Sequence, residues 1–277
     1  MSVERPVVRH GEMAACDSGH RFRLVSQPAG EPRGTVVFVQ PFAEEMNKSR
    51  RMCARLARRL AGAGWRIVQR DLCGCGDSSG EFRDATWAAW VDDVRAEVSA
   101  TDAARPAWLF CLRAGALLAP EALAVRRDLG LLLWQPVMSG ARHLQQFLRL
   151  HAGARIVGSG KAAASSPAQA LREGATVEIG GYELSPALAL GMEQADFDVP
   201  ADFAGRIVWL EIGQDDTPEP SPQAARMQER LATRGIPIDL HVVQGPAFWQ
   251  SVEIEECDAL IDRSMAAFTA VPEQALP

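Results

Sequence analysis

The chain has 277 residues, of which 47% are hydrophobic, and a formal net charge of -6. This length and apolar content can bury the core of one large domain, and the negative charge argues against nucleic acid as a general partner. No stretch reaches the roughly 18 apolar residues expected of a membrane span. Residues 1–13 lack the apolar segment of a signal peptide, so we expect a cytoplasmic protein.

Cysteine usage points to reduced thiols and no metal. The six cysteines are Cys16, Cys53, Cys73, Cys75, Cys111 and Cys257. Without an export signal, a disulfide framework is not expected. Cys73 and Cys75 are too close for the usual zinc spacing, and no second pair accompanies them. The sequence therefore predicts no metal and no cofactor.

The first half alternates predicted strands and helices, which is typical of a mostly parallel sheet covered on both faces. Apolar, β-branched runs predict strands over residues 35–40, 65–70, 107–112 and 129–135. Apolar residues at helical spacing predict helices over residues 50–61, 87–98 and 116–125. We therefore expect an α/β fold with a central parallel sheet.

Residues 139–202 depart from this alternation. They contain a helical piece at 143–151 and a tract of small residues, and the segment is too long for an ordinary loop. The alternation then resumes with strands at 207–212 and 238–243 and helices at 221–234 and 254–268. We therefore expect two core parts, 1–138 and 203–277, separated by a lid or cap insertion at 139–202. The alternative is that the small-residue tract is a simple connector.

Residues 108–119 resemble the nucleophile elbow of α/β-hydrolases. An apolar strand runs into a sharp turn, and small residues then open a helix. The elbow motif is G-x-S-x-G. In this chain Cys111 stands at the first glycine, Gly115 at the last, and Arg113 at the serine. Because arginine is always protonated and has no lone pair to attack a carbonyl, the pattern predicts the fold without its usual nucleophile.

The other two positions of a hydrolase triad are also unusual. The acid should follow the strand at 207–212, where Asp216 or Asp215 stands, although two adjacent acids also suit an ordinary turn. The base should follow the last strand, where the chain has Phe248. His241 lies inside that strand and is expected to face the core or the sheet surface. Acyl-enzyme chemistry of the usual kind therefore has no route.

Charged residues are dense after the first predicted core strand, in residues 41–51. Hydrolases often place an oxyanion-hole loop there. Glu44 and Glu45 are positioned to form an ion pair with Arg113 across the pocket, with a structural role. Alternatively, Arg113 at a helix N-terminus binds a carboxylate, phosphate or sulfate, which its planar guanidinium and the helix dipole both favour.

Five segments across nearly the whole chain resemble the family called exosortase A system-associated hydrolase 2. They are PFAEEMNKSRRM (41–52), DLCGCGDSSGEF (71–82), LRAGALLA (112–119), VEIGGYELSPAL (177–188) and FWQSVEIEE (248–256). The resemblance implies an α/β-hydrolase fold and a cytoplasmic bacterial protein from exopolysaccharide and protein-sorting gene clusters. It also implies that Arg113 and Phe248 are family features. A related hydrolase accompanies the family, so a heteromer joins a homodimer among the expected assemblies.

Catalysis is the first of two functional hypotheses. A hydrolase or acyl-transfer enzyme would act on an ester or thioester of a small or carrier-linked acyl or saccharide substrate. Its nucleophile would be Cys75 or Cys111, with Ser49 and Ser78 as alternatives. Cysteine is favoured because nearby Arg113 would lower its pKa.

Two further possibilities are water activation by a carboxylate and a non-catalytic binding role. Glu44, Glu45 or Asp216 would activate a water molecule directly, with no covalent intermediate. In the second hypothesis the chain is a pseudo-hydrolase whose Arg113 holds an anionic ligand or a partner protein. The predicted site residues are therefore Arg113, Glu44, Glu45, Cys75 and Asp216.

Overall fold

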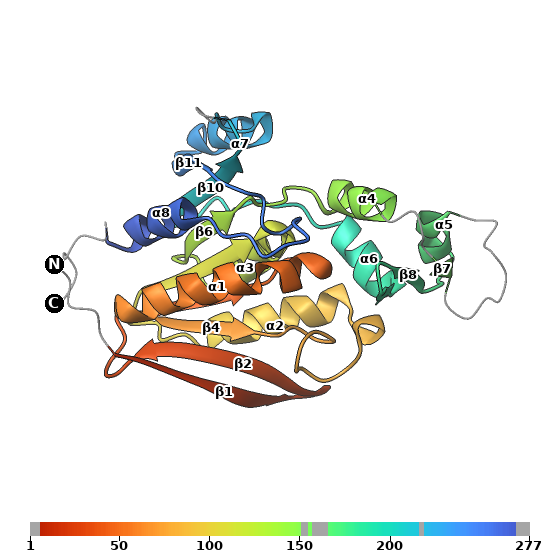
Figure 1. Cartoon of the computed structure of the whole chain (residues 1–277), viewed down its shortest axis with the longest axis horizontal. Coiled ribbons are helices and arrows are strands. Elements are labelled where there is room, and N and C mark those ends of the chain that lie inside the picture. The colour runs from red at the N-terminus through yellow and green to blue at the C-terminus, as the bar shows by residue number, and fades with distance from the viewer. Residues whose placement is uncertain (1–5, 151–154, 157–165, 216–218, 270–277) are drawn as a thin grey trace.

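The computed structural model describes residues 6–150, 155–156, 166–215 and 219–269. Its centre is an eight-stranded sheet with the order β1-β2-β4-β3-β5-β6-β10-β11 (Figure 1). The strands are β1 (Val7–Cys16), β2 (Gly19–Pro28), β3 (Thr35–Val39), β4 (Arg66–Arg70), β5 (Ala107–Leu112), β6 (Gly130–Trp134), β10 (Ile207–Gly213) and β11 (Ile238–Gln244). From β4 to β11 all neighbours are parallel. The expected mostly parallel α/β sheet is confirmed.

Helices cover both faces of the sheet. One face packs against α1 (Glu44–Gly62) and α8 (Asp258–Thr269), and the other against α2 (Trp87–Ser99), α3 (Ala119–Val125) and α7 (Pro222–Ala232). Each layer has its own apolar cluster because β5 and β6 are buried on both sides. This two-sided burial explains why the two central strands are continuous apolar runs in the sequence.

An N-terminal hairpin extends the sheet at one edge, and the sequence did not predict it. β1 pairs antiparallel with β2 from Val7–Pro28 to Cys16–Gly19, and β2 pairs antiparallel with β4. β1 is an edge strand whose residues are mostly exposed, so it lacks the alternation of apolar and polar residues that marks a half-buried strand. The pattern that would have revealed this strand was therefore absent.

Helix α1 begins at Glu44, whereas the sequence predicted its start at Arg50. The first turn contains Glu44 and Glu45, and acidic side chains stabilise the positive end of the helix dipole. Neither glycine nor proline interrupts residues 44–50, so nothing in that segment stops the helix. The correction matters because it places both carboxylates on a rigid element beside the elbow.

The chain between β6 and β10 forms a separate group of small elements. These are α4 (Gly140–Leu150), β7 (Arg155–Ile156), α5 (Pro167–Arg172), β8 (Val177–Ile179), β9 (Tyr182–Leu184) and α6 (Pro186–Glu193). They lie together to the right of the sheet in Figure 1. A Cβ atom on Gly191 would come within 2.3 Å of the Trp87 Cβ, so α6 packs directly on α2. The predicted small-residue tract lies largely outside the described residues.

None of the helices in the described ranges combines the length and apolar composition that crossing a bilayer would require.

Candidate functional site

The elbow after β5 has the strained backbone that its sequence predicts. Arg113 has a φ of 52°, a left-handed conformation that costs a non-glycine residue about 1–2 kcal/mol. A Cβ on Gly115 would lie 2.5 Å from the Val39 carbonyl oxygen, so a larger residue would collide with β3. The turn therefore keeps the geometry of a nucleophile elbow while presenting a guanidinium.

Two further non-glycine residues in the described ranges have positive φ, and both also follow central strands. Ala43 has a φ of 51° after β3, and Gln135 has a φ of 42° after β6. Because β3, β5 and β6 are neighbours, the three strained positions lie at adjacent strand ends. Backbone strain of this kind clusters at functional sites, so the structure independently marks the edge of the sheet that the elbow motif indicated.

Arg113 is held by three neighbours. Its Nε donates to Glu45 Oε1 at 3.1 Å, and its Nη1 donates to the Gln135 carbonyl at 3.4 Å. The guanidinium carbon lies 5.5 Å from the ring centroid of Trp249, a cation–π contact. The expected ion pair is confirmed, with Glu45 as the partner. Nη2 makes no hydrogen bond to any residue in the described ranges and remains available as a donor.

A cavity of about 610 Å³ adjoins this ion pair. Phe42, Phe147 and Trp249 form its apolar wall. Its charged lining comprises Glu44, Glu45, Lys48, Arg113 and Arg149. Cavities of this size that combine an aromatic wall with a few polar groups are typical of small-molecule sites.

Glu45 is a buried acid in the lining of this cavity. Burial raises the pKa of its carboxyl group, while the charge and hydrogen bond of Arg113 act in the opposite direction and only partly offset the rise. Its Oε2 is buried and has no hydrogen-bond partner within the described part of the chain. A buried acceptor without a partner is costly, so this oxygen is positioned to accept a hydrogen bond from a water molecule or substrate.

His143 is a site residue that the sequence did not reveal. It belongs to α4, lines the same cavity as Arg113 and Glu45, and is only 7% exposed. Burial, with a contribution from Arg113, lowers its pKa to about 3, so the imidazole is neutral at pH 7. Its Nε2 is buried without a hydrogen-bond partner among the described residues. The helical piece was predicted, but no motif distinguishes this histidine from a packing residue.

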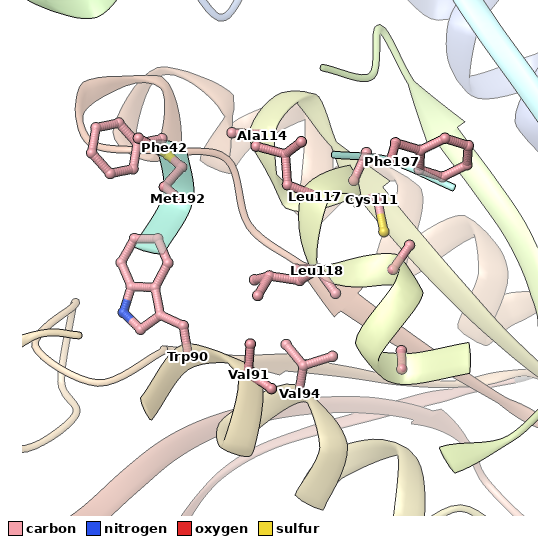
Figure 2. Close-up of a cluster of buried hydrophobic side chains, with 14 of the residues drawn as sticks. Phe42, Trp90, Val91, Val94, Cys111, Ala114, Leu117, Leu118, Met192 and Phe197 are labelled. Carbon is pink, nitrogen blue, oxygen red and sulfur yellow. The ribbon is translucent and has the colours of Figure 1, made fainter. Parts of the chain in front are cut away.

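Neither cysteine candidate has the environment of a nucleophile. Cys75 does not line the cavity, and burial raises its pKa to about 12, the reverse of the expected lowering by Arg113. Cys111 is fully buried, and burial raises its pKa as well. Figure 2 shows Cys111 beside Leu117 and Phe197 within a cluster of apolar side chains. A thiol that stays protonated is a poor nucleophile.

The serine candidates also lie away from the cavity. Ser49 is completely buried in α1. The Ser78 hydroxyl donates to the Asp71 carbonyl at 2.6 Å and accepts from the Phe22 backbone N–H at 2.9 Å, which ties a loop to β2. Both serines therefore belong to the packed structure and not to the lining of the cavity.

The remaining triad positions do not complete a catalytic triad in the described residues. Asp216 lies outside the described residues, and Asp215 is exposed. Phe248 is buried against Trp134 and Trp249. His241 of β11 contacts Asp239 of the same strand and Arg263 of α8, and it does not line the cavity.

No group of three or more histidine, cysteine, aspartate or glutamate side chains in the described ranges is arranged to hold a metal ion.

Comparison with solved structures defines the class of fold. Est1E from Butyrivibrio proteoclasticus superposes with a TM-score of 0.60 at 13% identity, covering 94% of this chain and 99% of that one. A soluble variant of monoglyceride lipase from Saccharomyces cerevisiae gives 0.58 at 14% identity, covering 94% and 93%. The thioesterase domain from the curacin biosynthetic pathway gives 0.54 at 13% identity, covering 95% and 100%. The chain therefore has the α/β-hydrolase fold.

No protein-family model and no curated protein sequence matches the chain. At the identities found, the structural likeness establishes the fold, and function has to be argued from the site.

Proposed function

We propose that the protein hydrolyses an ester or thioester with a water molecule activated by Glu45, without a covalent intermediate. The observation that carries this proposal is the buried Oε2 of Glu45, which has no partner among the described residues and lies beside Arg113 in a cavity with an aromatic wall. The raised pKa of Glu45 makes its carboxylate a stronger base than an exposed glutamate. None of the cysteine or serine candidates lines that cavity.

The proposed reaction begins as Glu45 takes a proton from water while the water oxygen attacks the carbonyl carbon of the substrate. The carbonyl π electrons move to its oxygen, which accepts a hydrogen bond from Arg113 Nη2. The tetrahedral intermediate then collapses and breaks the bond to the leaving oxygen or sulfur. The leaving group receives the proton from Glu45, so the carboxylate is restored and the products are an acid and an alcohol or thiol.

The aromatic wall supports an acyl or aryl substrate. Phe42, Phe147 and Trp249 provide flat apolar surface next to the ion pair. Est1E, which shares the fold at a TM-score of 0.58, has been solved with ferulic acid bound. Aromatic acid esters are therefore the first substrates to test on this chain.

The insertion at 139–202 fits the proposal as a lid between core parts 1–138 and 203–277. It supplies His143, Phe147 and Arg149 from α4 to the cavity wall. Phe147 of α4 packs edge-on against Phe42 with ring centroids 5.0 Å apart, so the insertion packs on the segment that follows β3. Closure of such an element would exclude water other than the attacking molecule.

The resemblance to exosortase A system-associated hydrolase 2 supports a setting for this reaction. We include in the proposal a cytoplasmic bacterial enzyme of exopolysaccharide metabolism, with a carrier-linked acyl or saccharide substrate. Assembly as a homodimer or with a related hydrolase is part of the same proposal.

A non-catalytic binding protein is the second candidate, and the occupant of the elbow favours it. Arg113 stands where the nucleophile would be and is fixed by Glu45 and Trp249. In this alternative the cavity holds an anionic ligand or a segment of a partner protein against the guanidinium.

Replacing Glu45 tests the proposed function. Glu45→Gln keeps an acceptor for Arg113 but removes the base, so we expect kcat/KM for a feruloyl or p-nitrophenyl ester to fall about 10²–10⁴-fold. Glu121→Gln, on α3 and paired with Arg95, is the matched control and should match the wild type. Wild-type activity in Glu45→Gln would contradict the proposal. Binding without turnover in the wild type would favour the second candidate.

A further inference from the structure

A second cavity, of about 560 Å³, is lined by four arginines. They are Arg113 from the elbow, Arg142 from α4, and Arg226 and Arg230 from α7. Arg113 lines this cavity and the aromatic cavity alike. A ligand that contacts Arg113 in one cavity can therefore extend into the other cavity.

Two of these guanidinium groups have no anionic partner among the described residues. Arg113 pairs with Glu45, and Arg230 pairs with Asp198 at 3.2 Å. Arg142 and Arg226 form no hydrogen bond or ion pair with any residue in the described ranges. Their charges are left for something outside the described chain to neutralise.

The carboxylate among the described lining residues is already bound elsewhere. Glu211 accepts hydrogen bonds from the Ser221 backbone N–H at 2.7 Å and from the Ser221 hydroxyl at 2.8 Å. It therefore serves the N-terminus of α7 and forms no ion pair with the arginines. Pro222 and Gln223 of the first turn of this 11-residue helix also line the cavity, so the positive end of the helix dipole adds to the arginine charges.

We propose that this cavity binds a phosphate group of the substrate. A phosphate monoester carries a charge between about -1.5 and -2 at pH 7, which matches the two guanidinium groups that no described residue pairs with. Its oxygens suit the planar, bidentate donors of arginine better than a single carboxylate would. The inference rests on the proposed function and deepens it. The substrate class is an ester or thioester whose alcohol or thiol part carries a phosphate, with the scissile carbonyl at Arg113.

Inorganic phosphate is the direct probe of this site. Calorimetric titration of the full chain, at constant ionic strength, would give the Kd of phosphate for the wild type, Arg142→Gln and Arg226→Gln. Loss of one charged hydrogen-bond donor should raise the Kd about tenfold or more in each variant. Both side chains are exposed, so the substitutions should leave folding intact.

Arg58→Gln provides the matched control, because Arg58 is an exposed arginine of α1 outside this cavity. Its Kd should equal the wild-type value. Absence of phosphate binding to the wild type, or an unchanged Kd in both Arg142→Gln and Arg226→Gln, would overturn the proposal.

A pair of aryl esters, with and without a phosphate on the alcohol part, separates this proposal from the hydrolytic one. We expect the wild type to have a higher kcat/KM for the phosphorylated ester than for the unphosphorylated one. In Arg226→Gln the ratio of these two values should fall about tenfold. Phosphate binding combined with full activity of Glu45→Gln would refute the role of Glu45 and leave the phosphate site standing. Hydrolysis with no preference and no phosphate binding would refute the phosphate site alone.

Discussion

Arg113 occupies a left-handed backbone conformation that carries a cost for any residue but glycine. Its ion pair with Glu45, its hydrogen bond to the Gln135 carbonyl and its contact with Trp249 hold it there. The side chain of Arg113 is 16% exposed and that of Glu45 is 14% exposed, so the ion pair is largely buried but still in contact with solvent. An ion pair in this position holds a hydrogen-bond donor and a carboxylate beside the same cavity.

Burial of His143 predicts that the free energy of unfolding depends on pH. The folded state holds its pKa near 3, whereas the unfolded chain titrates near the ordinary histidine pKa of 6.5. As the pH falls below 6.5, the unfolded chain binds a proton that the folded chain does not, so the free energy of unfolding decreases. Between pH 7 and pH 4 this histidine should cost the folded state about 3 kcal/mol.

Urea unfolding of His143→Phe at pH 7 and pH 4 checks this effect. The difference in unfolding free energy between the two pH values should shrink by about 3 kcal/mol relative to the wild type. His20→Phe, at an exposed position of β2, is the control. A difference equal to that of the wild type would show that His143 is accessible to protons in the folded state.

Buried charges join the elements on the N-terminal side of the sheet. Arg21 of β2 donates to both carboxylate oxygens of Asp93 at 2.9 Å, and Arg70 of β4 lies 3.4 Å from Asp93 and 3.1 Å from Glu97. Asp93 also accepts a hydrogen bond from the Cys73 backbone at 2.8 Å. This network fastens the unpredicted hairpin and β4 to α2. The helical spacing of apolar residues in the sequence predicts the buried apolar face of α2 but not these buried charges.

Asp93→Ala should destabilise the fold by about 3–5 kcal/mol because it leaves two buried guanidinium groups without this partner. The neighbouring Asp92→Ala, at an exposed position of the same helix, should change the stability by less than about 0.5 kcal/mol. Chemical denaturation of both variants makes the comparison. Equal stabilities would mean that the network does not hold the hairpin in place.

At the scale of the whole molecule, the sequence predicted what hydrophobic pattern and turn chemistry determine. The strand at 107–112, the elbow at Arg113 and the helix predicted at 221–234 all follow from local residues, and the structure has them at or within two residues of those positions. The N-terminal hairpin and the start of α1 were missed because an exposed edge strand and a charged helix terminus carry little apolar signal.

The candidate site was likewise predicted only in part from the sequence. The ion pair of Arg113 was predicted from the ends of two strands, because parallel strands end at one edge of a sheet. His143 and the arginines of α7 reach this edge only through the tertiary packing of α4 and α7. Burial of Cys75 and Cys111 likewise depends on which face of the sheet each side chain meets.

Intact-mass spectrometry distinguishes water activated by Glu45 from a covalent nucleophile. The protein would be quenched during turnover of activated aryl esters and thioesters, and product release would be recorded on the same samples. The account predicts product without any acyl adduct on the wild type, and neither adduct nor product above background for Glu45→Gln. A stoichiometric adduct that maps to Cys75, Cys111, Ser49 or Ser78 would contradict it and establish a covalent nucleophile.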